Sequence, residues 1–400
     1  MTAVPLAEPG SDLAKLARRS CQLDLFRGVA AIFMIVNHAG YQLLGAGAAG
    51  GGWPTWLVFV GSAAPALFFF ATGVGSGLSA SRGEPFASAM RKVVLLLLAD
   101  ALLNWSTGTL LGLDFFGFAA VATATLFFVR RATRPSFVAV VLLGLVLVLR
   151  FGLASVARAH VSDDSVLAFV TGIAPVHHVS YPLGPWLAFP LLGFLVGRRW
   201  RESGTSEEAW ILAGVAGLCL ALSALLAARG APVFRWGSVS LAYFLCAIGI
   251  VGVAWLCTGR VTHALPTVAQ DVSLRGPASL LIVPLHYGFL GVLEVLRPSP
   301  WGVAAWALAT FALVITVFLS SRVLLSGARR IAAPGNLVQV AIAAIAIVIG
   351  LIAWRNWPAL PRLETCSAGQ VAVALLLLWS SNRTPVPGLA RSDGLPVNRT

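Results

Sequence analysis

Long apolar stretches recur along the whole chain and are separated by short polar segments. A helix that crosses a bilayer core about 30 Å thick needs roughly 20 mostly apolar residues. By that measure the pattern predicts ten to twelve membrane-spanning helices. The shortest runs, the fourth, the sixth and the last, leave open a tilted, re-entrant or interfacial placement. The expected spans cover residues 23–44, 55–80, 93–112, 115–129, 136–157, 183–197, 209–228, 237–257, 278–296, 302–324, 336–353 and 369–380.

The composition excludes the other broad classes of protein. Hydrophobic residues make up 58% of the 400 residues and charged residues only 11%, whereas a soluble chain is about 25% charged. The mean hydropathy is +0.87. We therefore expect an all-α, polytopic membrane protein with one transmembrane domain at 21–381. The segments 1–20 and 382–400 lack apolar periodicity and predict disordered cytoplasmic tails.

The basic residues alternate in number from one connecting segment to the next. The chain has 28 Lys+Arg and a net charge of +13. Twenty of the 28 fall on the side of the N-terminus, seven fall on the other side, and Arg27 lies within the first span. Because cytoplasmic loops are enriched in Lys and Arg, this asymmetry predicts that both termini are cytoplasmic. The charge thus indicates topology and gives no reason to expect a nucleic-acid partner.

Ionisable residues inside a membrane span are rare and are candidates for function. The first span holds Asp24, Arg27 and His38. Arg27 and His38 are eleven residues apart, which is about three helical turns plus 20°, so they share a helix face about 16 Å apart along the axis. In the predicted orientation Arg27 is nearer the cytoplasm and suits an anionic donor, while His38 lies deeper. Asp24, at i−3, is placed to pair with Arg27.

Other polar residues fall in later spans and in the longest outer loop. Asp100 and Asn104 are four residues apart, so they line a cavity or join helices by hydrogen bonds. His286 lies in the ninth span and either reaches the site or is a hydrogen-bonded core residue. In the outer loop, His177 and His178 follow two aspartates without regular ligand spacing, which predicts no metal site.

Several motifs, in order along the chain, are similar to those of one enzyme group. The first is Leu23-Asp24-Leu25-Phe26-Arg27-Gly28 with Met34-Ile35-Val36-Asn37-His38. An aromatic run ending in Gly follows at 63–73, and the later motifs are Tyr181-Pro182-Leu183-Gly184-Pro185-Trp186 with Gly193 and Gly197-Arg198, Ser238-Val239-Ser240-Leu241-Ala242-Tyr243, and Leu280-Leu281-Ile282-Val283-Pro284-Leu285-His286. Together they cover about residues 20–295. The set resembles the transmembrane acyltransferase superfamily, which includes acyltransferase-3 proteins and heparan-α-glucosaminide N-acetyltransferase-like proteins.

The resemblance implies an O- or N-acyltransferase, most simply one that uses acetyl-CoA as co-substrate and has no permanently bound cofactor. The acyltransferase-3 pattern implies that Arg27 engages the donor and that His38 acts as general base. In the heparan-α-glucosaminide branch an Asn lies at the position of Asn37, and the catalytic His lies eleven residues after it. This chain has Ala48 at that later position, so this branch's His has no counterpart here. Orienting or cavity-lining residues are then Asp24, Asn37, Asp100, Asn104 and His286, and acceptor-side candidates are His177, His178, Tyr181 and Trp186.

The resemblance also implies an acceptor and a location. The acyl group would pass to a hydroxyl or amine of a glycan, a lipid-linked sugar or another cell-envelope molecule, in the plasma membrane. The rival interpretation is a transporter or flippase whose buried Arg, Asp and His form a substrate or proton path. Transporters commonly show two corresponding halves with broken helices, and no such symmetry is evident. A non-catalytic scaffold would leave the pairing of Arg27 with His38 unexplained.

Overall fold

The structure is a computed structural model whose regular elements are helices throughout the described part of the chain. One isolated β-bridge joins Leu113 to Val179. The all-α prediction is confirmed. The structure describes residues 9–45, 52–79, 83–106, 113–153, 165–174, 176, 179–203, 207–233, 239–274, 276–296, 300–330 and 369–377.

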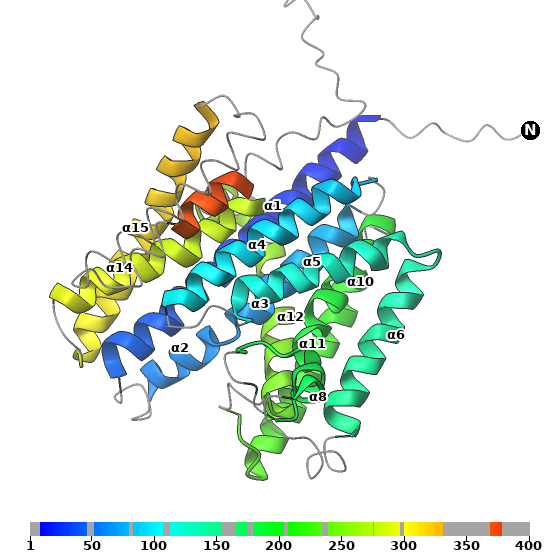
Figure 1. Ribbon diagram of the computed structural model, residues 1–400, viewed down its shortest axis with the longest axis horizontal. Helices are drawn as coiled ribbons and strands as arrows, with labels where there is room; N and C mark the ends of the chain where they lie inside the picture. Colours follow the sequence, from blue (N-terminus) through cyan, green and yellow to red (C-terminus); the bar gives the residue numbers. More distant parts are fainter. Residues whose placement is uncertain are drawn as a thin grey trace, which may run out of the picture.

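The helices follow one another with short connections (Figure 1). A π-helical turn, η1, continues α1, and a second one, η3, continues α6. Their bounds are α1 Pro9–Ala39, η1 Gly40–Leu44, α2 Trp53–Gly61, α3 Ala64–Leu78, α4 Phe86–Ser106, α5 Phe115–Arg131, α6 Pro135–Leu147, η3 Val148–Gly152, α8 Val166–Thr171, α9 Leu183–Trp186, α10 Ala188–Ser203, α11 Glu207–Ala228, α12 Leu241–Ala264, α13 Pro266–Val272, η4 Gly276–Leu281, α14 Ile282–Leu296 and α15 Val303–Arg330.

Helices occupy every predicted span that falls in the described residues, and 336–353 lies outside them. Seven helices or helix pairs of this part are long and apolar enough to cross a membrane. The protein is therefore a multi-pass membrane protein, as predicted. Helix α1 begins at Pro9, so helical backbone reaches into the segment 1–20 that was expected to be a disordered tail. Leu, Ala, Lys and Arg, which fill much of 12–19, are good helix formers.

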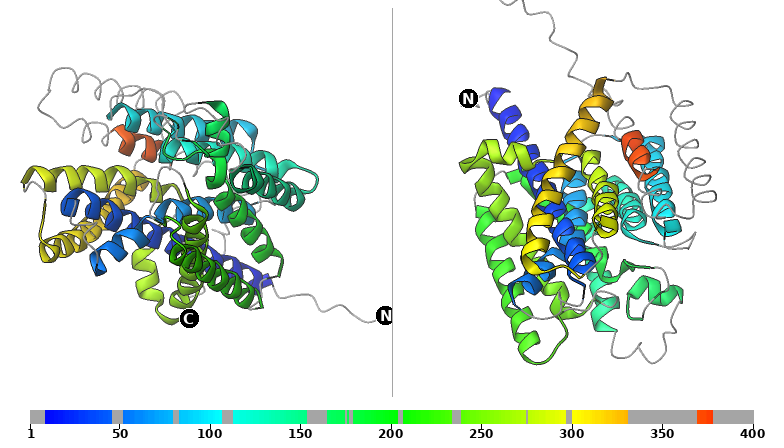
Figure 2. Two further views of the ribbon diagram at one scale, coloured as in Figure 1. Left: turned by 90° about the horizontal axis from the view of Figure 1, so that it is seen from below. Right: turned by 90° about the vertical axis from the view of Figure 1, so that its left-hand side faces the viewer.

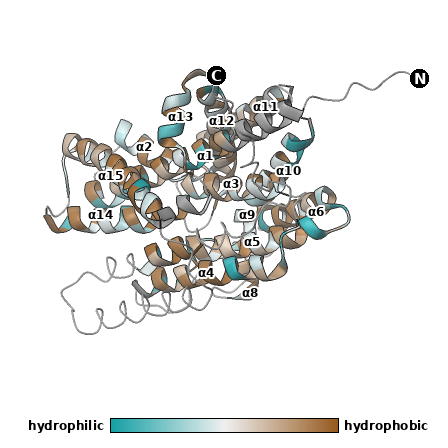
Figure 3. Cartoon of the chain, turned by 90° about the horizontal axis from the view of Figure 1, so that it is seen from above, coloured by the Kyte–Doolittle hydropathy of each residue, from teal (hydrophilic) through white to brown (hydrophobic). Residues whose placement is uncertain are grey.

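A central group of helices is surrounded by three pairs of helices. Helices α1, α3 and α10 lie in the middle, α4 and α5 on one side, and α11 and α12 on the other (Figure 3). Helices α14 and α15 pack together at the flank of α1. The short helical segment 369–377 lies beside α4 (Figure 2), where the Gln370 amide donates a hydrogen bond to the Ala99 carbonyl over 3.2 Å.

Glycine brings α3 and α10 into direct backbone contact. A Cβ on Gly73 would overlap the carbonyl oxygen of Pro190, and a Cβ on Gly193 would overlap that of Phe70. Gly77 and Gly197 meet the facing backbone one turn further along. Small residues at a helix interface allow such close approach within a membrane. The glycines of the aromatic-run and Gly-Arg motifs therefore serve helix packing.

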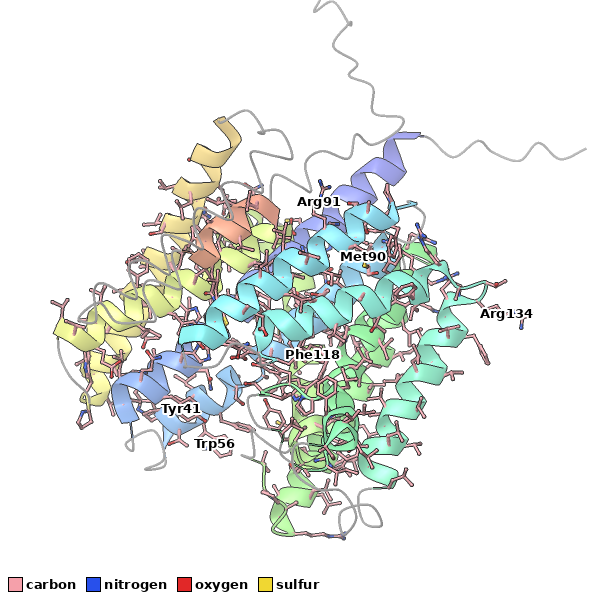
Figure 4. The ribbon with its side chains drawn as sticks, in the orientation of Figure 1. Tyr41, Trp56, Met90, Arg91, Phe118 and Arg134 are labelled. Atoms are coloured by element: carbon pink, nitrogen blue, oxygen red, sulfur yellow. The ribbon has the colours of Figure 1, made fainter. Side chains whose placement is uncertain are left out.

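Burial separates central helices from peripheral ones. Within an 18-residue apolar stretch of the span formed by α2 and α3, 83% of residues are buried inside the bundle, against 11% in such a stretch of α11. Tyr41 and Trp56 lie at one end of the bundle, and Arg91 and Arg134 lie toward the other (Figure 4). Under the predicted orientation the arginine end faces the cytoplasm, and aromatic residues lie at the outer interface, where they are enriched in membrane proteins.

Candidate active site

His38 lies at the last turn of α1, where the helix changes to the π-helical turn η1. Single π-helical turns are frequent at functional sites, because they shift side chains off the regular helix register. The turn is anchored from outside by the Trp301 N–H, which donates to the Leu43 carbonyl over 2.7 Å. His38 and Tyr41 both line one cavity of about 420 Å³. The end of α1 therefore forms one wall of that cavity.

His38 is held by a second histidine. The Nδ1 atom of His38 lies 2.7 Å from Nε2 of His286, and Nδ1 of His286 lies 2.8 Å from the Ile282 carbonyl oxygen. A carbonyl can only accept, so Nδ1 of His286 donates and, in the neutral ring, its Nε2 accepts. Nδ1 of His38 must then carry the proton it donates. Nε2 of His38 then carries no proton, and its lone pair makes it the basic nitrogen of the ring.

Tyr287 completes the group around His38. Its hydroxyl lies 3.5 Å from Nε2 of His38, and its ring stacks on the His38 ring with centroids 4.9 Å apart. The rings of His38 and His286 stack at the same separation. Consecutive residues of α14 thus supply both the group that orients His38 and a hydroxyl beside its basic nitrogen.

The cavity is apolar on most of its surface and carries a few polar groups. Tyr41, which is 58% exposed, lines it at the end of the bundle where Trp56 also lies (Figure 4). This mixture of an apolar wall with a few placed polar groups is typical of small-molecule sites. The lining residues are Met34, Asn37, His38, Tyr41, Gly61, Ala64, Pro65, Leu103, Asp114, Phe115, Ser180, Tyr181, Val283 and Tyr287.

Asp100 and Asn104 lie one step behind the cavity wall. One carboxylate oxygen of Asp100, Oδ2, accepts from the Asn104 amide at 2.9 Å and from the Asp114 N–H at 3.2 Å. Neither Asp100 nor Asn104 lines the cavity among the described residues. Asn104 is bonded to Asp100, and Asp100 holds the backbone N–H of Asp114 at the start of α5.

Arg27 and Asp24 form an ion pair away from this cavity. The distance from Nη1 of Arg27 to Oδ1 of Asp24 is 2.8 Å, and their side chains are 16% and 15% exposed. The pairing that the i,i+3 spacing predicted is present. Two glycines make room here, because Gly28 meets the backbone of α13 and a Cβ on Gly75 would lie 3.2 Å from Nη2 of Arg27. The Leu274 N–H donates to the Asp24 carbonyl over 2.9 Å.

The remaining sequence candidates have different fates. Asn37 lines the cavity and its amide donates to the Val58 carbonyl over 2.8 Å, which ties α1 to α2. Tyr181 lines the cavity, whereas Trp186 is fully buried and is not among the cavity-lining residues. Trp186 packs edge-on against Tyr181, with centroids 4.9 Å apart. His177 and His178 lie outside the described residues.

Two site residues, Asp114 and Tyr287, were missed by the sequence reasoning. Tyr287 directly follows His286, and Asp114 precedes the aromatic start of a span, a position typical of an N-cap. Neither signal by itself indicates a cavity.

In the described part of the chain no group of three or more His, Cys, Asp or Glu is arranged to hold a metal ion.

The model of the catalytic region of heparan-alpha-glucosaminide N-acetyltransferases matches residues 19–224, more than half of the chain. The chain belongs to this family. The matched region contains Arg27, His38 and Asp114, while His286 and Tyr287 follow it. Membership in the heparan-alpha-glucosaminide N-acetyltransferase family supports a membrane acetyltransferase type of function. Comparisons with curated proteins and with solved structures found no match.

Proposed function

We propose that the protein transfers an acetyl group from acetyl-CoA to a hydroxyl or amine of a glycan, a lipid-linked sugar or another cell-envelope acceptor at the plasma membrane, with His38 as general base. The observation that carries this proposal is the cavity-lining His38, whose Nδ1 is hydrogen-bonded to His286. Its Nε2 carries the lone pair that would take the proton of the acceptor. A neutral imidazole is suited to this task near neutral pH.

The transfer step balances with the groups at hand. The acceptor oxygen or nitrogen attacks the thioester carbonyl carbon while Nε2 of His38 takes the acceptor proton. The carbon–sulfur bond of the collapsing intermediate then breaks, and the thiolate leaves and receives the proton from the imidazolium. His286 supports the charged imidazolium through the Nδ1–Nε2 contact of 2.7 Å. The Tyr287 hydroxyl, 3.5 Å from Nε2, donates to the carbonyl oxygen as it becomes negative, which is the function of an oxyanion-hole donor.

Arg27 serves the donor side of this reaction. It lies three helical turns from His38 on the same helix, toward the arginine-rich end of the bundle. Coenzyme A carries phosphate groups, and guanidinium groups bind phosphate through paired hydrogen bonds. Asp24, bonded to Nη1 of Arg27 at 2.8 Å, orients the guanidinium. We place the coenzyme at the cytoplasmic end and the acceptor at the cavity, so the acetyl group is transferred near His38.

The test uses the full chain in nanodiscs with radiolabelled acetyl-CoA and a cell-envelope extract as source of acceptor. We expect His38→Ala to lower label transfer by about 10²–10⁴-fold, the usual contribution of general base catalysis. Arg27→Ala should raise the KM for acetyl-CoA by about tenfold or more, since a charge-assisted phosphate contact is lost. His263→Ala, which removes an exposed histidine at the end of α12, is the matched control.

Two results would overturn this proposal. If transfer is unchanged in both the His38 and Arg27 variants, these residues do not act in catalysis. If the wild type neither transfers nor binds acetyl-CoA and instead moves a labelled glycan lipid across the membrane, the protein is a transporter or flippase.

A further inference from the structure

The proposed reaction uses the His38 wall of the cavity and leaves a second polar wall unexplained. That wall consists of Asp114 and Ser180, which come from two connections far apart in the sequence. The β-bridge between Leu113 and Val179 joins the two connections, and the Ser180 N–H donates to the Leu113 carbonyl over 3.0 Å. Asp114 and Ser180 both line the cavity. Two separate segments are thus held together at the cavity.

The carboxylate of Asp114 is well fixed on its protein side. Its Oδ1 atom accepts from the Phe115 N–H at 2.8 Å, as the N-cap of α5. Its backbone N–H is held by Asp100, as described above. An N-cap function needs only a small polar side chain, and Ser, Asn or Asp all satisfy it. The negative charge at the cavity is therefore not required for the cap.

The charge pattern of the cavity indicates a ligand. Among the described residues that line it, Asp114 is the only one with a formal charge when His38 is neutral, and no lysine or arginine faces it. A carboxylate in an apolar wall binds hydrogen-bond donors strongly and disfavours anions, because the surroundings screen charge less than water does. Three tyrosines, Tyr41, Tyr181 and Tyr287, line the same cavity. Their rings provide flat surfaces on which a sugar ring can pack.

We propose that Asp114, with Ser180, is the acceptor-binding subsite. It holds a hydroxyl or ammonium group next to the one that is acetylated, and it excludes acceptors with a carboxylate or phosphate at that position. This inference rests on the proposed acetyltransferase function and adds the acceptor specificity. A cavity of about 420 Å³ is near the lower end of the range of ligand sites, roughly 300–1,000 Å³. A cavity of this size accommodates about one sugar ring of the acceptor.

The experiment measures acetyl transfer by the full chain in nanodiscs to three soluble probes, namely glucosamine, glucose and glucuronate, which are cationic, neutral and anionic. Each probe is also used as a competitor of transfer to the envelope acceptor. The wild type should prefer glucosamine to glucose and glucose to glucuronate. Asp114→Asn keeps the N-cap and removes the charge, and we expect it to raise the KM or inhibition constant for glucosamine by about tenfold to hundredfold. It should also abolish the preference for the cation over the anion.

Two further variants separate the binding function from a structural one. Ser180→Ala keeps the carboxylate, so the charge preference should persist with weaker binding of all three probes. Asp271→Asn makes the same chemical change at a carboxylate that is 74% exposed on α13, and should leave every constant unchanged. The KM for acetyl-CoA should not change in any of the three variants.

The inference is overturned if Asp114→Asn leaves the order of the three probes unchanged, or if the wild type does not distinguish glucosamine from glucuronate. Failure of the proposed function has a different signature. In that case the wild type transfers no acetyl group to the envelope extract at all, whatever the residue at position 114.

Discussion

The two ends of the first membrane span, Cys21–Leu44, hold the two residues that the sequence presents as a pair, and the surroundings of these residues differ completely. At the end that is predicted to face the cytoplasm, called the inner end below, Arg27 is paired with Asp24 and closely packed by α3 and α13. At the outer end His38 faces a cavity of about 420 Å³ and is held by α14. Helical spacing puts both residues on one face, but only the neighbouring helices make one end packed and the other hollow.

In the proposed reaction this difference lets one helix serve two functions. The packed inner end restricts Arg27 to one arrangement, as suits a residue that binds a charged group. The open outer end leaves Nε2 of His38 accessible while its Nδ1 is fixed. Each prediction below disturbs one end and leaves the other as reference.

The largest effect is expected from His286→Ala at the cavity end. Without His286 the ring of His38 loses the contact that fixes its tautomer and orientation. Transfer should fall by about 10²-fold, the lower part of the range for general base catalysis, with little change in the KM for acetyl-CoA. Steady-state kinetics in nanodiscs measure both constants. A variant with full kcat would show that His38 is oriented without its partner.

At the inner end, Gly77→Ala should destabilise the protein. A Cβ at Gly77 would overlap the backbone of α10 at Phe194, and overpacking of this kind costs about 1–3 kcal/mol. Gly217→Ala on α11 is the control, because a Cβ there meets nothing within 4 Å and alanine gains up to about 1 kcal/mol of helix propensity. Thermal unfolding in detergent, followed by tryptophan fluorescence, should order the variants with Gly77→Ala lowest. Equal melting temperatures would argue against the close crossing.

Tyr287→Phe sharpens the cavity end further. The phenyl ring retains the stacking on His38 and loses only the hydroxyl, so kcat should fall by about tenfold or more with both KM values unchanged, as for the loss of an oxyanion donor. Tyr181→Phe is the comparator, since Tyr181 lines the same cavity and its ring packs against Trp186. Its effect should fall on the acceptor KM. A larger loss of kcat in Tyr181→Phe would reverse the assignment of the two tyrosines.

The smallest effect is expected at Glu84, in the connection between α3 and α4 at the inner end. Lys92 and Arg130 lie 2.6 and 3.0 Å from its carboxylate. Burial raises the pKa of Glu84, but the hydrogen bonds and charges of Lys92 and Arg130 outweigh it, and the net pKa is lowered.

The sign of the pH effect follows from this lowered pKa. The ion pairs stabilise the fold above the unfolded pKa of Glu84, and the stabilisation is lost as pH falls through the folded pKa. Because the site is partly exposed, the contribution is below about 1 kcal/mol. Melting temperatures between pH 7 and pH 3 should fall slightly more for the wild type than for Glu84→Gln. Identical profiles would mean that these ion pairs do not contribute to stability.

Much of the fold follows from local sequence properties. A run of apolar residues predicts a helix wherever it is long enough, and the spans at 209–228 and 302–324 coincide with α11 and α15. Hydropathy does not show whether a helix is surrounded by lipid or by other helices. Lipid and protein interior are both apolar, so α11 at the periphery and α3 at the centre have the same kind of sequence.

The candidate site was predicted only in part, because only some of its residues lie close together in the sequence. Arg27, Asp24 and His38 lie on one helix, so their relation follows from the helical repeat alone. The contact of His38 with His286 joins residues 248 positions apart, and family resemblance, not spacing, indicated that His286 was of interest. Asp114 requires the meeting of two connections at residues 113 and 179, which no local pattern predicts.

The sequence by itself determined the membrane class, the helical spans, the charge asymmetry and the face of α1 that carries Arg27 and His38, because each depends on residues close together in the chain. Only the tertiary structure decided that Asp100 holds the backbone of Asp114, that Trp186 is buried in the core, and that His286 and Tyr287 meet the ring of His38. These properties depend on hydrogen bonds and packing between helices that are far apart in the sequence. A shift of about an ångström would break such a hydrogen bond. For that reason the residue types were recognisable in advance and their functions were not.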